Sequence, residues 1–412
     1  MHIAIVTGHF PTVSQTFVLN QITGFIDAGH EVTILASPPM KEEALHPAVE
    51  KYELMEKVHY WAGDPSEETS AAGALLDAAR TAKPKRLLGA LRNSRKAIRR
   101  GGDKWSAELV ARAVRTAPLP EFDAIVCHFG TLGRKCQMLR DMGALRGPLA
   151  TIFHGYDMSL FLKERGDDVY DRLFERGELF LPISEFWRER LLGMGAPSAQ
   201  TVVHRMGVDP GRFSFEERRP GGEGRVEILS IARLVEKKGI SYGLEAFARI
   251  VEDFPQARYT IIGDGPLRGE LEELVRELEI AEFVEFAGWR DRDEVLRALQ
   301  SHQILFVPSV TAENGDMEGL PVVLMEGLAT GIPVVSTRHS GIPELVRHGE
   351  SGLLADERDV DGLEEHLRAL LNDADSWSGY GRRGRAIVEE EFNISKLNDR
   401  LIELLEQRFG DR

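Results

Sequence analysis

The stretch "DPGRFSFEERRPGGEGRVEILSIA", residues 209–232, decides the fold that we expect from this sequence. Its first part, 209–225, is rich in proline, glycine and charged residues, which is typical of a linker. Its second part, 226–232, is a short apolar run with the composition of a buried β-strand. Before and after this stretch, similar short runs alternate with longer helical patterns, so the rhythm of strand and helix stops at the linker and then restarts.

This alternation predicts an α/β protein with parallel sheets and crossover helices. The strand candidates are 2–6, 31–36, 123–128, 149–154, 179–183 and 201–206 before the linker, and 226–232, 259–263, 284–288, 304–308 and 332–336 after it. A chain of 412 residues suits two such domains. We therefore expect two doubly wound, Rossmann-like domains that face a central cleft.

The expected domains are 1–208 and 226–391, joined by the linker 209–225. The last segment, 392–412, contains an amphipathic helical pattern at 393–409 with no strand after it. We expect this helix to pack back on the first domain.

The composition bounds the class of protein. The net charge of −15 argues against general affinity for nucleic acid, and 42% hydrophobic residues are typical of a globular protein. The two cysteines, Cys127 and Cys136, fit neither a metal site nor a disulfide framework, which favours a reducing compartment. The sequence shows no signal peptide and no apolar run long enough to span a bilayer. We therefore expect a cytoplasmic protein.

Four motifs of the second half follow expected strands, where the ligands of doubly wound sheets bind. They are "ARLVEKKG" (232–239), "GDGP" (263–266), "EGLPVVLMEG" (318–327) and "HSGIPELV" (339–346). Each motif alone is more often a surface loop or an ordinary turn. Their joint occurrence in this order indicates one binding site.

The charges in these motifs suit a phosphorylated ligand. Arg233 and Lys238 can bind phosphate oxygens, and a helix that begins near Pro321 offers unpaired N–H groups to the same phosphates. Phosphates would repel Glu318 and Glu326, unless these carboxylates accept hydrogen bonds from the hydroxyl groups of two sugar rings. A nucleotide sugar carries a diphosphate between two such rings.

These residues resemble those of the GT-B type retaining glycosyltransferases of family 4, over nearly the whole chain and most strongly from 226 to 355. The hallmark of the family is a pair of glutamates separated by seven residues, here Glu318 and Glu326. The family's "GRLxxxKG" element is similar to "ARLVEKKG", with Ala232 in place of glycine. "GDGP", "FAGW" (286–289) and "SGIPELV" also match the family pattern.

The resemblance implies that Arg233 and Lys238 hold the diphosphate, Glu326 the ribose and Glu318 the donor sugar. It implies a UDP-sugar as the favoured donor, with GDP next. The donor-binding set implied by the resemblance also contains Gly319, Leu320, Pro321, Gly263, Gly265, Gly288 and Arg290.

The resemblance also implies a retaining reaction without a metal or other cofactor. Arg233, Lys238 and the helix N-terminus can replace the charge of a divalent ion. The acidic run "DRD" (291–293) is similar to the metal-binding motif of other glycosyltransferases, but its position at a helix start favours N-capping.

In the first half, "TGHFPTVSQTF" (7–17) joins the first strand to the first helix. It is similar to a subgroup of transferases that build exopolysaccharides. We expect Phe10, Ser14, Gln15 and Thr16 to contact the acceptor. N-capping by Ser14, and a contact of Gln15 or Thr16 with the donor phosphate, remain open.

"FHGYD" (153–157) ends another expected strand. His154 is similar to the family's histidine near the donor sugar and is a catalytic candidate, with His128 as a weaker one. A buried structural histidine is the alternative for both. Asp157 is a candidate for binding an acceptor hydroxyl group.

The region 83–100, "KPKRLLGALRNSRKAIRR", holds eight Lys or Arg residues and no acid. Such a helix can lie on an anionic membrane surface, and a solvated helix on the first domain is the alternative. The surface interpretation adds a peripheral position on the inner face of the membrane.

The sequence therefore favours a glycosyltransferase that moves a sugar from a nucleotide diphosphate to a glycan or lipid-linked acceptor in exopolysaccharide assembly. A non-catalytic nucleotide-sugar-binding protein and another GT-B enzyme, such as an epimerase or a glycogen-type synthase, are the alternatives. A dinucleotide-dependent dehydrogenase is disfavoured, because no glycine fingerprint follows the first strand.

Overall fold

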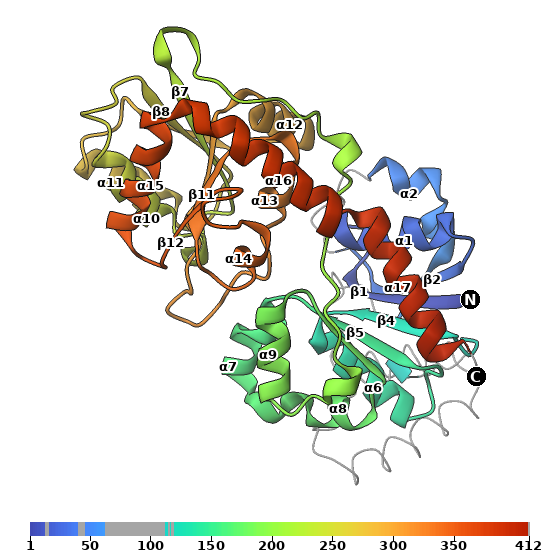
Figure 1. Ribbon diagram of the computed structural model, residues 1–412. Coiled ribbons are helices and arrows are strands. Elements are labelled where there is room, and N and C mark those ends of the chain that lie inside the picture. Colours follow the sequence, from blue (N-terminus) through green and yellow to red (C-terminus); the bar gives the residue numbers. More distant parts are fainter. Residues whose placement is uncertain (13–15, 40–45, 62–111, 114–115, 117–118, 411–412) are drawn as a thin grey trace. The chain divides into compact units, whose positions relative to one another are not determined.

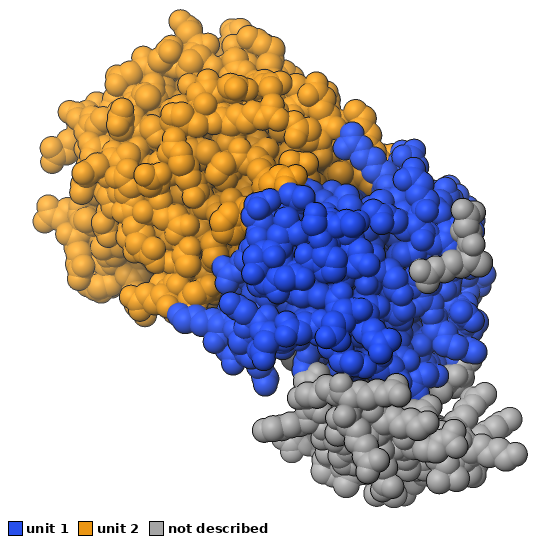
Figure 2. Space-filling view, turned by 60° about the horizontal axis from the view of Figure 1, so that its bottom comes forward, with its two compact units in different colours: residues 1–183, 188–204, 398–412 blue, residues 184–187, 205–397 orange. Residues whose placement is uncertain are grey.

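The computed structural model describes residues 1–12, 16–39, 46–61, 112–113, 116 and 119–410. The chain divides into two compact units, coloured separately in Figure 2. Unit 1 comprises Met1–Ile183, Arg188–His204 and Asn398–Arg412, and unit 2 comprises Ser184–Trp187 and Arg205–Leu397.

Unit 1 is built around a parallel six-stranded sheet with the order β3-β2-β1-β4-β5-β6. The strands are β1 (His2–His9), β2 (Glu31–Ser37), β3 (Val58–Tyr60), β4 (Ala124–His128), β5 (Leu149–Phe153) and β6 (Leu179–Pro182). The helices are α1 (Thr16–Asp27), α2 (Pro47–Lys51), α6 (Gly130–Asp141), α7 (Leu160–Arg165), α8 (Asp171–Arg176) and α9 (Glu185–Gly193). The strand order reverses between β1 and β4.

Unit 2 contains a second parallel six-stranded sheet, with the order β12-β11-β10-β7-β8-β9. Its strands are β7 (Val226–Ile231), β8 (Ala257–Ile262), β9 (Val284–Gly288), β10 (Ile304–Val307), β11 (Val334–Thr337) and β12 (Leu353–Ala355). Its helices are α10 (Ile240–Ala248), α11 (Arg268–Glu277), α12 (Arg292–Ser301), α13 (Val322–Thr330), α14 (Ile342–Leu345), α15 (Val360–Asn372) and α16 (Trp377–Glu391). The order reverses between β7 and β10. In unit 1 it reverses between β1 and β4, which are both labelled in Figure 1.

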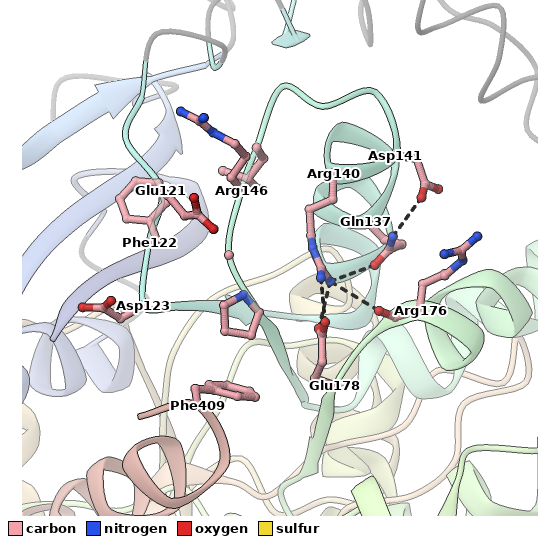
Figure 3. A pocket seen from close by; sticks show the side chains of 13 residues that line it. Glu121, Phe122, Asp123, Gln137, Arg140, Asp141, Arg146, Arg176, Glu178 and Phe409 are labelled. Atoms are coloured by element: carbon pink, nitrogen blue, oxygen red, sulfur yellow. Dashed lines mark hydrogen bonds and ion pairs between the residues drawn. The ribbon is translucent and has the colours of Figure 1, made fainter. Parts of the chain in front are cut away.

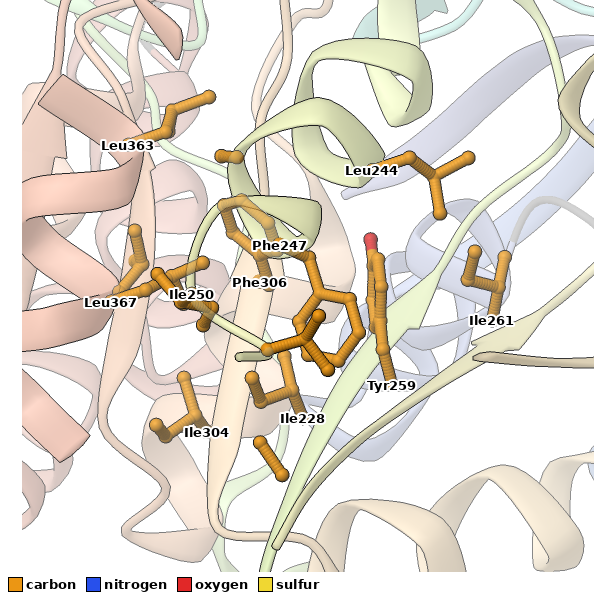
Figure 4. Close-up of a cluster of buried hydrophobic side chains, with 14 of the residues drawn as sticks. Ile228, Leu244, Phe247, Ile250, Tyr259, Ile261, Ile304, Phe306, Leu363 and Leu367 are labelled. Carbon is orange, nitrogen blue, oxygen red and sulfur yellow. The ribbon is translucent and has the colours of Figure 1, made fainter. Parts of the chain in front are cut away.

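One face of the second sheet is covered by α10, α11 and α15, whose apolar stripes form a continuous core with the strands (Figure 4). Leu244 and Phe247 of α10 pack there with Tyr259 of β8 and Phe306 of β10, and none of these side chains has exposed surface. Burial of each such side chain contributes about 1.5–3 kcal/mol to folding. This core fixes the strand ends that carry the motifs.

The α/β class and the parallel sheets expected from the sequence are confirmed. Two edge strands, β3 and β12, were not expected, because each is only three residues long. The expected strand 201–206 is wrong. Val202 and His204 donate to the carbonyl oxygens of Phe180 and Pro182, but the ladder is limited to a single bridge between Phe180 and Thr201.

The segment 209–225, which we expected to be a linker, is part of unit 2. Arg218 is buried, and its Nη2 donates to the carbonyl oxygens of Leu299 and Thr330 at 2.8 and 3.2 Å. The helix expected at 393–409 is present as α17 (Ile394–Phe409). Within unit 1, Asn398 of this helix donates to the carbonyl oxygen of Asn20 at 3.2 Å.

Candidate functional site

The predicted donor residues of unit 2 lie on the loops that follow β7, β8, β9 and β10. The carboxyl ends of parallel strands meet at one edge of the sheet, and ligands of doubly wound sheets bind where the strand order reverses, which here is between β7 and β10. The loop after β7 carries Arg233 and Lys238, and the loop after β10 carries Glu318. The structure therefore places these three predicted residues at the position in the sheet where ligands bind.

Two lysines hold Glu318. Lys238 Nζ lies 2.7 Å from Glu318 Oε2, and Lys237 Nζ lies 3.4 Å from Oε1. Lys237 also lies 3.0 Å from a carboxylate oxygen of Asp316. The sequence reasoning missed Lys237, because a neighbouring lysine gives no signal of its own until the loop conformation is known.

This arrangement requires glycine after the lysines. Gly239 has a positive φ of 63°, and a Cβ atom there would lie 1.8 Å from the carbonyl oxygen of Pro308. Only glycine allows the loop after β7 to approach β10 this closely. The backbone N–H of Val310 then donates to the carbonyl oxygen of Lys237 at 2.9 Å.

The ion pairs keep Glu318 charged. Burial acts to raise the pKa of this carboxyl group, but the two lysines outweigh it and lower the pKa to about 2. Each lysine ammonium has three N–H donors, so the bond to Glu318 leaves further donors on Lys238. A negative ligand can therefore bind beside the pair without displacing it.

Arg233 is exposed, and its guanidinium makes no hydrogen bond or ion pair with any residue that the structure describes. It lies after β7 in a loop whose backbone is held by the next loop along the sheet. The N–H of Leu234 donates to the carbonyl oxygen of Asp264 at 2.9 Å. The position of Arg233 is thus set by the main chain, while its five donors remain available.

Three of the predicted glycines allow the loops after β7, β8 and β9 to pack against each other. A Cβ at Gly263 would lie 1.9 Å from the carbonyl oxygen of Ala232, and one at Gly265 would lie 2.5 Å from that of Leu234. The N–H of Gly263 donates to the carbonyl oxygen of Gly288 at 2.8 Å. These residues bring main chain, rather than side chains, to the strand ends.

Glu326 lies on α13 and is half-buried. Burial raises the pKa of its carboxyl group to about 7, against the opposing effect of Arg292 and Arg212. In the described part of the chain no donor forms a hydrogen bond to this carboxylate. The two arginines are a second feature that the sequence reasoning missed, because Arg212 lies in the segment interpreted as a linker.

The start of α13 has no side-chain cap. Its N-cap residue is Pro321, whose side chain cannot accept a hydrogen bond, so the first N–H groups of this nine-residue helix are available to a ligand. Leu320 and Pro321 are buried, and Gly319 between them and Glu318 is half-buried.

The loop after β9 presents an exposed aromatic ring. Trp289 is 72% exposed, and Arg290 lies 3.8 Å from Glu294 in an exposed ion pair. The N-capping expected for "DRD" is confirmed. Asp291 accepts the N–H of Glu294 at 2.8 Å, and Glu294 accepts that of Asp291 at 3.0 Å, which forms a capping box.

In unit 1, His128 and His154 end neighbouring strands, β4 and β5, and form one buried chain of hydrogen bonds. His128 Nε2 lies 2.9 Å from Oε1 of Gln21 on α1, and His128 Nδ1 lies 3.3 Å from His154 Nε2. An amide oxygen only accepts, so Nε2 of His128 carries the proton and its Nδ1 accepts from His154. This order assigns the proton of His154 to Nε2.

Burial keeps both rings neutral. It lowers the pKa of His128 to about 3 and that of His154 well below the usual value, and His204 adds to both effects. The rings of Phe17 and Phe129 lie 5.0 and 4.4 Å from the ring of His154. His154 therefore suits a role as a neutral hydrogen-bonding group rather than as a cation.

Asp157 serves the main chain around it. Its Oδ1 accepts the N–H groups of His154 and Gly155 at 3.0 Å, and its Oδ2 accepts that of Gly130 at 2.7 Å. The side chain has no exposed surface, and burial raises its pKa to about 6. This geometry favours a structural role over the predicted contact with an acceptor.

The other predicted acceptor residues are only partly placed. Phe10 is 4% exposed and belongs to the core, and Thr16 is the first residue of α1. Ser14, Gln15 and the basic region 83–100 lie outside the described residues. Among the described helices, none combines the length and apolar character needed to cross a membrane.

A hollow of about 590 Å³ lies in unit 1 at the opposite ends of the strands (Figure 3). Its lining includes Asp123, Pro148 and Glu178, which directly precede β4, β5 and β6, respectively. Arg140 bridges this hollow with two bonds to Glu178, at 2.9 and 2.6 Å. Since ligands of such sheets bind at the carboxyl ends, we do not include this hollow in the candidate site.

Known proteins match this chain in sequence and in fold. The family described as Glycosyl transferases group 1 matches residues 213–387. The chain is similar to the colanic acid biosynthesis glycosyltransferase WcaL of Salmonella typhimurium, with 39% identity over 404 residues, 96% of this chain and 97% of the relative. It is also similar to the amylovoran biosynthesis glycosyltransferase AmsK of Erwinia amylovora, with 38% identity over 411 residues, 99% of this chain and 100% of the relative.

A solved structure with a similar fold is that of Alr3699/HepE from Anabaena in complex with UDP-glucose. The TM-score is 0.71 at 17% identity, and the match covers 99% of this chain and 100% of the other. At this identity the likeness concerns the fold alone. It confirms the GT-B fold that we expected from the sequence.

Proposed function

Because this chain belongs to the glycosyl transferases group 1 family, we propose that it transfers the sugar of a nucleotide diphosphate donor to a glycan or lipid-linked acceptor in exopolysaccharide assembly. The family assignment makes the chain a glycosyltransferase. A UDP-sugar is the favoured donor, since the Anabaena structure of the same fold holds UDP-glucose.

One observation carries the proposal. At the reversal point of the second sheet, Lys238 is anchored to Glu318 at 2.7 Å, while Arg233 after the same strand has an exposed guanidinium. The uncapped start of α13 follows Glu318 after four residues. Three sources of positive charge thus come from neighbouring strand ends, which suits a diphosphate.

In this proposal Glu318 and Glu326 accept hydrogen bonds from the hydroxyl groups of two different rings of the donor. Glu318 is ionised and held in place beside Gly319, which suits recognition of the donor sugar. Glu326, on the helix α13 that directly follows this segment, accepts no hydrogen bond from the described residues and suits the ribose. A carboxylate accepts two hydroxyl groups of a ring with charge-assisted hydrogen bonds.

The reaction that we propose retains the configuration of the anomeric carbon and needs no metal. The acceptor oxygen attacks the anomeric carbon on the face of the leaving group, the bond from that carbon to the diphosphate oxygen breaks, and the acceptor proton passes to this oxygen. Arg233 and Lys238 stabilise the charge that develops on the diphosphate. Neutral His154 supports this step as an acceptor of a hydrogen bond through Nδ1, because its one ring proton, on Nε2, is donated to His128.

The alternatives left open by the sequence receive no support from the relatives, which carry the names of transferases. We further propose that the basic region 83–100 binds anionic membrane surface and so brings the enzyme to a lipid-linked acceptor.

The test is a panel of UDP- and GDP-sugars, each assayed for release of the free nucleoside diphosphate and for a rise in melting temperature. We expect one donor to be hydrolysed slowly and to stabilise the protein, with equal rates in the presence and absence of a chelator. The absence of hydrolysis and stabilisation across the panel would contradict the proposal, and loss of activity with the chelator would contradict its metal-free mechanism.

A further inference from the structure

The loop between β11 and α14 holds the main chain of the segment that carries Glu318. We call its residues His339–Gly341 the HSG loop. His339 Nε2 accepts the backbone N–H of Glu318 at 2.9 Å, and Ser340 Oγ donates to the carbonyl oxygen of Gly319 at 2.9 Å. The HSG loop therefore binds both the N–H of Glu318 and the carbonyl oxygen of Gly319.

The hydrogen bonds of His339 determine its tautomer. A backbone N–H can only donate, so Nε2 must present its lone pair and the proton must lie on Nδ1. Nδ1 lies 2.6 Å from Oε1 of Glu357, the carboxylate that receives this proton's hydrogen bond. The side chain of His339 has no exposed surface, so water cannot substitute for either partner.

Hydrogen bonds to Glu357 favour its ionised form, which only accepts hydrogen bonds. The backbone N–H of Thr311 donates to its Oε2 at 2.6 Å. Burial acts to raise the pKa of Glu357, but the bonds from His339 and Thr311 lower it to about 2. An ionised carboxylate accepts only, which excludes the other tautomer of His339.

The HSG loop also contains strained and tightly packed backbone. Ser340 has a positive φ of 45°, which is unusual for a residue other than glycine and costs about 1–3 kcal/mol. A Cβ at Gly341 would lie 3.4 Å from the carbonyl oxygen of Gly319 and 3.0 Å from Cβ of Ser184. A strained conformation persists where the surrounding contacts determine it, and strained residues cluster at functional sites.

We propose that the HSG loop and Glu357 are positioning elements for the segment Glu318–Pro321, which fix its main chain through the Nδ1-protonated ring of His339. This inference rests on the proposed function, in which that segment binds the donor sugar. His339 acts through Glu318 and does not touch the reacting atoms. The expected effect lies on sugar transfer, because the nucleotide is bound by Arg233 and Glu326.

The first test needs no substrate. In protein with ¹⁵N-labelled histidine, NMR correlation of the ring nitrogens with the ring protons distinguishes the two neutral tautomers. We expect the signal that disappears in His339→Gln to be that of an Nδ1-protonated ring. An Nε2-protonated ring would overturn the inference, and this outcome is independent of whether the protein is a transferase.

The second test uses the donor identified by the panel. We expect His339→Phe to lower kcat about 10- to 100-fold, because small displacements of a positioning group have effects of this size. The Kd of the free nucleoside diphosphate, measured by calorimetry, should change less than about threefold. His339→Gln, whose amide oxygen can again accept the N–H of Glu318, should recover most of the lost rate.

His348→Gln is the matched control. His348 Nδ1 accepts the backbone N–H of Leu354 at 3.0 Å, the same kind of bond on another loop, and the variant should keep the wild-type kcat. If His339→Phe fails to fold, Ser340→Ala removes only the donor to Gly319 and carries the same kinetic test. Wild-type kcat in the folded variant, or an equal loss of kcat in the control, would overturn the inference. The proposed function would be overturned by a different result, namely that the wild-type protein hydrolyses none of the nucleotide sugars in the panel and is stabilised by none of them.

Discussion

Replacement of Glu326 by glutamine is expected to stabilise the protein and to weaken donor binding at the same time. Burial raises the pKa of Glu326 to about 7 in the folded protein, against 4.5 in the unfolded chain. A carboxyl group whose folded pKa is raised contributes stability that is fully present below pH 4.5 and is lost as the pH rises through 7. At pH 8 the wild-type protein therefore carries an unfavourable charge that glutamine does not have.

The magnitude follows from the two pKa values. A difference of about 2.5 in pKa at 1.36 kcal/mol each gives about 3 kcal/mol at pH 8, which is an upper value because the side chain is only half-buried. At pH 5, where the folded carboxyl group is protonated and the unfolded one is partly ionised, the difference falls to about 1 kcal/mol or less. The stabilisation by glutamine should thus grow with pH.

The assay is urea unfolding of both proteins at pH 5 and pH 8, followed by circular dichroism. Glu365→Gln is the control, because Glu365 is exposed on α15 and forms no ion pair within the described residues. We expect no stabilisation in this control at either pH. A Glu326→Gln variant that is no more stable at pH 8 than the wild type would refute the raised pKa of Glu326.

Donor binding should change in the opposite direction. If the ionised carboxylate accepts hydroxyl groups of the ribose, the loss of a charged hydrogen bond costs about 1.5–3 kcal/mol, or about 10- to 100-fold in Kd. The wild-type affinity should also weaken as the pH falls below about 7, and this pH dependence should be absent in Glu326→Gln. A residue that lowers stability and raises affinity is typical of a functional site.

Two further predictions concern Glu318 and the lysines that pair with it, and a third concerns the basic region 83–100. Lys238→Ala should weaken the affinity for the donor, measured by calorimetry, about 10- to 100-fold. The variant should remain folded, because Lys237 still pairs with Glu318. An unchanged Kd would contradict a contact between Lys238 and the diphosphate. Glu318→Gln should destabilise the protein by about 3 kcal/mol at pH 7 and progressively less towards pH 2. The pKa of this carboxyl group is lowered, so its contribution to stability is present above pH 4.5 and is lost as the pH falls through 2. If the difference in urea midpoint between the two proteins did not depend on pH, this would argue against the ion pair. The full chain should float with liposomes of anionic lipid at low salt and not at high salt, and flotation that ignores salt would exclude binding by the region 83–100.

Local patterns were sufficient to predict the parallel sheets and their central strands. Apolar runs of five or six residues, such as "AIVCH" and "VEILSI", form buried central strands, and their alternation with helices favours parallel pairing. The three-residue edge strands β3 and β12 carry too few residues for such a pattern. The run 201–206 has the composition of a strand but makes only one bridge, since pairing depends on a partner that the sequence does not name.

The common location of candidate residues was predictable where these residues follow neighbouring strands. Arg233, Lys238 and Glu318 follow strands, and the parallel sheet brings strand ends together, so their common location needs no knowledge of side-chain packing. The partners of those residues were not predictable in this way. Lys237 pairs with Asp316 and Glu318, about eighty residues away, and that contact exists only after Gly239 has let the loop approach Pro308.

The HSG loop shows why the second class of residue cannot be found from motifs. "HSGIPELV" is recognisable as a strand-loop-helix junction, yet the role that we propose for His339 depends on which of its ring nitrogens carries the proton. That choice is made by Glu357, which lies beyond α14 and β12 in the chain, and by the N–H of Glu318, which lies before β11. A motif names residues that lie together in sequence, whereas a tautomer is set by groups that only the folded chain brings together. Residues of this kind therefore have to be found from the hydrogen bonds around a predicted site, starting from the main chain of its most constrained member.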